Sequence, residues 1–138
     1  MQFHPYLAFA GNARDAFTQY QEIFGGELVV LTGADTPDGV SADSPAEAVL
    51  HAALALPDGG LLMGADDPGG TFDGQNRGIC VNCAVADTAE ATRVYDALAE
   101  GGSVQLELGE TFFSPAFGMC TDRFGIPWMV NAPAPDAP

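Results

Sequence analysis

Two segments of the chain carry the same helical pattern about 75 positions apart. Residues 12–26 read NARDAFTQYQEIFGG, and residues 87–102 read DTAEATRVYDALAEGG. In each segment a polar residue suited to the N-cap precedes an apolar stripe at helical spacing, and two glycines follow the stripe. Each segment is therefore predicted to be an amphipathic helix, capped by Asn12 or Asp87, that ends at its glycine pair.

The flanks of the two helices repeat as well. FHPYLAFAG and GICVNCAVA precede them, ELVVLTG and SVQLELG follow, and each half continues through two more apolar segments joined by a turn, PDGG or DRFG. This pattern predicts an α+β chain of two βαβββ modules, over residues 1–75 and 76–132, with a C-terminal tail at 133–138. Because repeats of this length are too short to be stable alone, we expect them to form one domain with a shared core.

Two irregular stretches separate the predicted elements. Residues 33–46, GADTPDGVSADSPA, are predicted to be a loop, either a mobile lid or a connection without a function of its own. Residues 66–76, DDPGGTFDGQN, are predicted to be the hinge between the modules.

The charge of the chain limits its partners. It has 19 Asp and Glu residues against 4 Arg and Lys, for a formal net charge of −15. Such a surface repels phosphate, so nucleic acids and anionic membranes are not expected as partners. No apolar run approaches the roughly 18 residues of a membrane span, and MQFHPYLAF lacks the basic start of a secretory signal. We expect a cytoplasmic protein.

The three cysteines are expected to be reduced thiols that pack in the fold. An odd count in a chain without a signal argues against a disulfide framework. Cys80 and Cys83 form CVNC, but a redox CxxC belongs at a helix N-terminus, and GICVNCAVA reads as a buried strand.

Three blocks of the sequence carry a resemblance to a known family. They are PYLAFAGNARDAFTQYQEIFGGEL near the start, LHAAL with LLMGAD in the middle, and above all ETFFSPAFGMCTDRFGIPWMVN near the end. The chain resembles the vicinal oxygen chelate superfamily of glyoxalases, bleomycin resistance proteins and dioxygenases, and within it the PhnB-like members. The resemblance implies a glyoxalase/bleomycin-resistance-like fold with a U-shaped cleft, and a homodimer.

Enzymes of that superfamily hold a divalent metal with His and Glu from the first and last strands of each module. Here His4 lies near the first position, although alignment on the helix cap puts Pro5 there, and LLMGAD offers no Glu. Val81 or Asn82 stands where the second His is expected, and Met129 stands where the last Glu is expected. The chelating set is largely missing, so no metal cofactor is predicted. A displaced site of His4, His51 and Asp66 is the disfavoured alternative.

The remaining candidates predict a cleft that binds a small organic molecule. Such a cleft is mainly apolar and has a few polar groups that orient the ligand. The predicted ligand-binding residues are His4, Tyr6, His51, Phe112, Phe113, Phe117, Trp128 and Asn131. The aromatic residues are placed on the first, seventh and eighth strands; the competing interpretation is that they, and the two histidines, belong to the core.

The predicted function is therefore binding of a small organic molecule, to sequester or sense it. The alternative is a metal-dependent lyase, isomerase or dioxygenase with a displaced ligand set. Older labels link such sequences to a ubiquinone methyltransferase, but no glycine-rich nucleotide motif follows the first predicted strand, so methyl transfer is not predicted.

Overall fold

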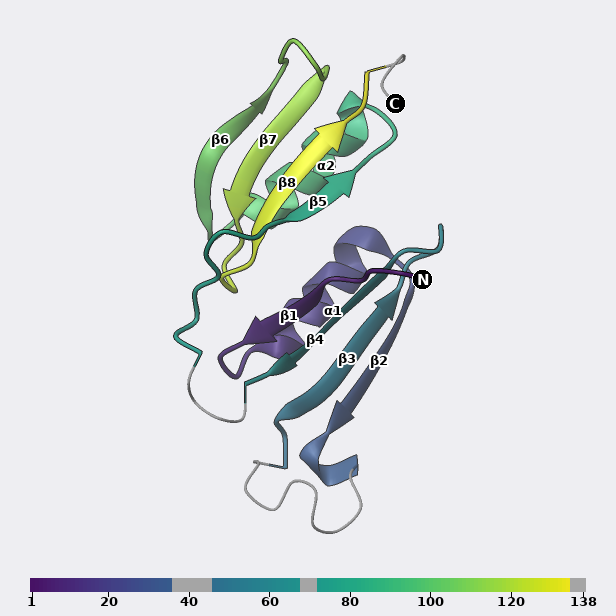
Figure 1. Ribbon diagram of the computed structural model, residues 1–138, viewed down its shortest axis with the longest axis vertical. Helices are drawn as coiled ribbons and strands as arrows, with labels where there is room; N and C mark the ends of the chain where they lie inside the picture. The colour runs from purple at the N-terminus through teal and green to yellow at the C-terminus, as the bar shows by residue number, and fades with distance from the viewer. Residues whose placement is uncertain (36–45, 68–71, 135–138) are drawn as a thin grey trace. The chain divides into compact units, whose positions relative to one another are not determined.

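The chain divides into two compact units, each with one helix and one four-stranded sheet. The computed structural model describes residues 1–35, 46–67 and 72–134, and the units are Met1–Gly74 and Gln75–Pro138 (Figure 1). The two sheets have the same connectivity, which confirms the α+β class and the two βαβββ modules.

The first unit has its strands in the order β1-β4-β3-β2, with β1 parallel to β4 and the other pairs antiparallel. Its elements are β1 (Tyr6–Phe9), α1 (Ala13–Phe24), β2 (Glu27–Thr32), the short 3-10 helix η1 (Gly33–Asp35), β3 (Val49–Ala55) and β4 (Leu61–Asp66). The tight turn between β3 and β4 forms at the predicted PDGG sequence, where the Gly59 N–H donates to the Leu56 carbonyl.

The second unit repeats this order as β5-β8-β7-β6, with β5 parallel to β8. Its elements are β5 (Val81–Ala84), α2 (Thr88–Ala99), β6 (Ser103–Gly109), β7 (Ala116–Thr121) and β8 (Pro127–Ala132). The turn between β7 and β8 forms at DRFG, where the Gly125 N–H donates to the Asp122 carbonyl.

In each unit the apolar stripe of the helix packs on one face of the sheet. In the first, Phe9 of β1 meets Phe17 of α1 edge to face, with ring centroids 5.8 Å apart, and both side chains are fully buried. In the second, Val94 and Leu98 of α2 are buried, as is Val130 of β8. Burial of these stripes, rather than intrinsic propensity, stabilises helices of only 12 residues.

The glycine pairs after the helices serve the same two purposes in both modules. The first glycine of each pair has a positive φ, +73° at Gly25 and +76° at Gly101, which other residues adopt at a cost. The second lies against the sheet: a Cβ on Gly26 would collide with the Ala55 carbonyl oxygen, and one on Gly102 with the Thr121 carbonyl oxygen. The second glycine is therefore required by close packing.

The prediction that Asn12 caps the first helix is wrong. The Asn12 side chain makes no capping hydrogen bond, whereas Asp87 accepts one from the Glu90 N–H at 2.8 Å, as predicted. The start of α1 is instead held by Asp66, the last residue of β4, whose Oδ1 accepts from the Ala13 N–H at 2.9 Å. Asp66 is thus a buried member of the fold and not part of a hinge.

The strand assignments also need correction. Phe112 and Phe113 precede β7 and lie in irregular backbone, because β7 begins only at Ala116. The predicted buried strand at 78–86 contains β5, but only four residues pair and their side chains are exposed or half-buried in alternation. Of the predicted loop at 33–46, residues 36–45 lie outside the described part of the chain, as do residues 68–71 of the predicted hinge and 135–138 of the tail.

Candidate functional site

Each sheet has a face turned away from its helix, which we call the open face. On the first sheet, alternation places Tyr6, Val29, Leu31 and Met63 there, opposite the buried Leu7 and Phe9 of the helix-facing side. Tyr6, Val29 and Leu31 are about half exposed, at 54%, 56% and 46%. The first unit therefore presents an apolar surface where its helix does not cover it.

The structure brings together two of the predicted ligand-binding residues on that face. Tyr6 of β1 reaches across β4 to His51 of β3: the Tyr6 Oη and His51 Nδ1 atoms are 3.0 Å apart, and the rings stack with centroids 5.7 Å apart. The tautomer of His51 sets which group donates. Tyr6 and His51 are thus a polar pair on a mainly apolar surface, on which Glu27 at the start of β2 is a charged exception.

The open face of the second sheet includes Phe117, Met129 and Asn131. Phe117 and Asn131 are direct neighbours across β7 and β8. Phe113 packs edge to face on Phe117 with centroids 5.1 Å apart, so the loop before β7 adds an aromatic side chain. The Asn131 Oδ1 is buried and accepts no hydrogen bond within the described residues.

Three other predicted site residues lie elsewhere. Trp128 is 2% exposed, and its Nε1 donates to Asp122 Oδ2 at 2.8 Å, so it is a core residue. His4 precedes β1, is exposed, and lies 3.2 Å from the Gln2 side chain. Phe112 is fully exposed at 101%. Side chains alternate between the two faces of β8, so Trp128 and Val130, two positions apart, lie on the same helix-facing side. This alternation is a signal in the sequence that could have placed Trp128 in the core.

A pocket in the second unit was not predicted from the sequence. It has a volume of about 430 Å³, within the usual range for small ligands. Ile79, Met119 and Pro127 give it apolar walls, and Gln105 and Thr121 add polar groups. The full lining is Asn76, Gly78, Ile79, Cys80, Gln105, Met119, Cys120, Thr121, Pro127 and Trp128. Because its residues come from four separate segments, only the folded chain assembles it.

Strand register tests whether the superfamily's metal site is retained. In the first unit, Tyr6 of β1 pairs with Met63 of β4; in the second, Asn82 of β5 pairs with Met129 of β8. Phenol, amide and thioether groups do not replace the imidazoles and carboxylates that hold a divalent ion. None of these four residues offers an imidazole or a carboxylate.

The alternative site of His4, His51 and Asp66 is not assembled either. Asp66 accepts hydrogen bonds from the backbone N–H groups of Ala13 and Val49, each at 2.9 Å, and its carboxylate is committed to the fold. Over residues 1–35, 46–67 and 72–134, no three His, Cys, Asp or Glu side chains lie close enough to hold an ion.

The cysteines show no sign of an activated nucleophile. Cys120 is buried on the helix-facing side of β7, and burial, with a smaller contribution from the Asp122 charge, raises the pKa of its thiol to about 11. Cys80 and Cys83 are half-buried, and none of the three cysteines forms a disulfide within the described residues.

Comparison with known proteins identifies relatives over nearly the whole chain. Residues 1–131 match the family described as 3-demethylubiquinone-9 3-methyltransferase. The chain is 32% identical to "Protein YjdN" of Escherichia coli K12, over 95% of both sequences. Its sequence is 40% identical to that of protein PA1353 from Pseudomonas aeruginosa, and the crystal structure of that protein matches with a TM-score of 0.86 over 96% of this chain and 98% of that one.

Two further structures share the fold at lower identity. The putative 3-demethylubiquinone-9 3-methyltransferase, PhnB protein, of Bacillus cereus is 24% identical with a TM-score of 0.78, covering 96% of this chain and 99% of that one. A glyoxylase/bleomycin resistance protein/dioxygenase domain from Frankia is 17% identical with a TM-score of 0.67, covering 97% and 98%.

Among the described residues no helix is long and apolar enough to cross a membrane.

The duplicated βαβββ plan, the family match over residues 1–131 and the shared fold agree with one another. The chain shares its fold with the PhnB protein of Bacillus cereus and the Frankia glyoxylase/bleomycin resistance protein/dioxygenase domain. It belongs to the family described as 3-demethylubiquinone-9 3-methyltransferase.

Proposed function

We propose that this protein binds a small, largely apolar organic molecule on the open faces of its sheets, without the metal chemistry of its superfamily. The observation that carries the proposal is the pocket of about 430 Å³ in the second unit, with Ile79, Met119 and Pro127 as apolar walls. Gln105 and Thr121 supply the few polar contacts that orient a ligand in such a pocket.

On the first sheet the same proposal assigns a contact role to Tyr6 and His51. Their paired polar atoms lie on a mainly apolar surface, and the second ring nitrogen of His51 is a further atom for a ligand. Phe113, Phe117 and Asn131 remain candidates on the second unit, because they lie on or beside its open face. The exposed His4 and Phe112 are left out of the proposed contact set. Trp128 is mostly buried in the core but also lines the pocket, so it remains in the set.

A ligand screen with matched variants tests the binding proposal. The native protein would be screened by thermal shift against aromatic diols, thiol adducts and quinones, because a ligand that prefers the folded state raises its melting temperature. The exposed Ile79 would be changed in Ile79→Asp. The control is Leu106→Asp, because Leu106 is also apolar and exposed but does not line this pocket. We expect Ile79→Asp to weaken the best ligand's affinity about tenfold and Leu106→Asp to leave it unchanged. Equal affinities in all three proteins would refute the assignment of this pocket.

The metal-dependent alternative is tested by metal content. Protein purified without chelator should contain no stoichiometric Ni, Mn, Fe or Zn, because the pairs Tyr6 with Met63 and Asn82 with Met129 are poor ligands for these ions. One equivalent of metal that is lost in His51→Ala would support the lyase, isomerase or dioxygenase function instead. Tight binding of S-adenosylmethionine would favour the methyl transfer named in the family description.

We also propose that the protein acts as a cytoplasmic homodimer. Apolar side chains such as Phe3 and Phe112 are well exposed in the single chain, at 91% and 101%, and association would bury such groups. Light scattering after gel filtration should give twice the chain mass of 14.3 kDa. A monomer mass at micromolar concentration would rule the dimer out.

A further inference from the structure

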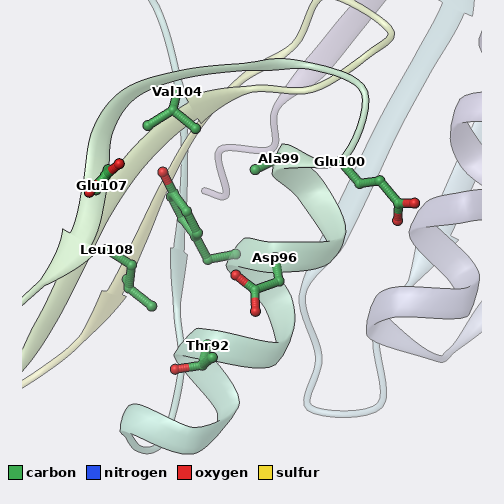
Figure 2. Close-up of a pocket in the computed structure, with 8 residues that line it drawn as sticks. Thr92, Asp96, Ala99, Glu100, Val104, Glu107 and Leu108 are labelled. Atoms are coloured by element: carbon green, nitrogen blue, oxygen red, sulfur yellow. The ribbon is translucent and has the colours of Figure 1, made fainter.

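A second groove lies in the second unit, on the helix side of the sheet, away from the open faces. It has a volume of about 520 Å³ and runs between α2 and the edge strand β6. In Figure 2 Thr92, Asp96 and Ala99 border it from the helix, Glu100 from the C-cap that follows the helix, and Val104, Glu107 and Leu108 from the strand. Tyr95 completes the lining.

The groove exists because of two differences between the modules. Counted from the residue before each helix, Phe17 and Phe24 of α1 correspond to Thr92 and Ala99 of α2. In the first module Phe17 and Phe24 pack against Tyr20, with ring centroids 5.6 and 6.3 Å away. In the second module a hydroxyl and a methyl group stand in their places, and both line the groove.

The edge strand contributes to the opening as well. The pairing of β6 with β7 is interrupted between Val104 and Leu106 and again between Leu106 and Gly109. Such irregularities bend a strand and alter its twist. The Tyr95 hydroxyl donates to the Leu106 carbonyl at 3.0 Å, so the tyrosine is held under the bent strand and forms a fixed part of the lining.

The groove combines apolar walls with a negative rim. Ala99, Val104 and Leu108 supply aliphatic surface, and Asp96, Glu100 and Glu107 supply three carboxylates; none of the eight lining residues is basic. The field of these carboxylates reaches the interior: burial raises the pKa of Tyr95, and the charges of Cys120, Glu107 and Asp96 raise it further. The carboxylates do not converge on one point closely enough to hold a metal ion.

From this geometry we propose that the α2–β6 groove is a binding site for a small organic cation, an amine with an aromatic or aliphatic body. The apolar part of the ligand packs against Ala99, Val104 and Leu108, and its ammonium group is attracted by Asp96 and Glu107. A second copy of this chain is a poor occupant of this groove, because it has only 4 Arg and Lys residues to pair with the three carboxylates of the rim; a dimer contact elsewhere on the surface avoids them. This site is separate from the open-face site proposed above.

The test uses the full chain labelled with nitrogen-15 and titrated with 2-phenylethylamine, which is protonated at pH 7, at low salt. The control ligand is 3-phenylpropanoate, which has a similar body and the opposite charge. We expect the amine to shift amide signals of α2 and β6 and the anion to shift none of them. Raising the salt to 0.5 M should weaken amine binding severalfold, because screening acts on the partly exposed carboxylates.

Two variants and a matched control assign the effect to the groove. Asp96→Asn with Glu107→Gln removes two charges and should weaken amine binding at least fivefold. The control, Glu22→Gln with Glu27→Gln, removes the same charge from exposed positions of the first unit and should leave amine binding unchanged. Ala99→Phe restores the aromatic residue found at the matching position of α1 and should abolish binding; the charge variants keep the test decisive if Ala99→Phe does not fold.

The outcomes separate this proposal from the open-face site. Amine-dependent shifts confined to β1, β3 or β7 would overturn the groove proposal and support the open-face one. Equal binding of amine and anion, or equal affinity in the two charge variants, would also overturn it. Concentration-dependent α2 and β6 signals without ligand would show that a second copy covers the groove, which would overturn it as well.

Discussion

Helices α1 and α2 begin in different ways although both follow a polar residue and both have 12 residues. Asp87 caps α2 within its own segment, whereas the α1 N-terminus receives its acceptor from Asp66, 53 residues away in β4. The same carboxylate also accepts from the Val49 N–H at the start of β3. One local pattern thus corresponds to a local cap in one module and to a tertiary link between three elements in the other.

The packing of the helix on the sheet also differs between the two modules. In the first module Phe9, Phe17 and Tyr20 form a chain of aromatic contacts, all fully buried. In the second, the matching stripe of α2 leaves a groove beside Tyr95. The first module is tied together by buried groups from distant elements, while the second has room for a ligand. Four predictions probe this contrast, from the largest expected effect to the smallest.

The largest effect is expected from Phe17→Ala. This change removes a fully buried ring that contacts Phe9 and Tyr20, and it should lower the free energy of unfolding by about 4 kcal/mol. The matching change in the second module, Thr92→Ala, should alter it by less than about 0.5 kcal/mol, because Thr92 is exposed. Urea denaturation measures both. Similar costs for the two changes would contradict the contrast in packing.

The next effect is expected from Asp66→Ala. It leaves the buried N–H groups of Ala13 and Val49 without their acceptor, and it should cost about 3 kcal/mol of stability. Hydrogen exchange should show faster exchange of both amides. The linking role would be refuted if those amides kept their protection in a variant that still folds.

A smaller effect is expected at alkaline pH through Cys120. Because its thiol pKa is raised to about 11 in the fold, the unfolded chain loses this proton at lower pH than the folded one. Stability should therefore fall between about pH 9 and pH 11, by roughly 2 kcal/mol for the two-unit difference. Cys120→Ala should flatten this slope relative to the wild type, and Cys80→Ser should not. Thermal melts across this range provide the measurement; parallel slopes in all three proteins would contradict the prediction.

The smallest effect is expected from Asp87→Ala, which removes the local cap of α2. The Glu90 N–H at an exposed helix start can bond to water instead, so the cost should be about 1 kcal/mol. Asp87→Asn should recover most of the loss, because an amide oxygen also accepts at the N-cap. A cost above that of Asp66→Ala would reverse the comparison between the two helix starts.

The sequence alone determined the duplicated plan of this protein. Alternating apolar residues, two apolar stripes at helical spacing and the glycine pairs identified both βαβββ modules, because these patterns reflect backbone periodicity and steric limits that act over a few residues. The cap at Asp87 was predictable for the same reason, since donor and acceptor lie three residues apart.

Only the tertiary structure decided which residues meet. Nothing local marks Asp66 as the partner of Ala13, or Tyr6 as the partner of His51, because these contacts join strands and helices far apart in the sequence. The placement of Trp128 in the core, the loop that holds Phe112 and Phe113, and both pockets likewise depend on how strands end, bend and pair. Local patterns fix the elements, but contacts between distant elements set which surfaces are filled and which stay open, because packing satisfies volume and hydrogen bonding across the whole unit.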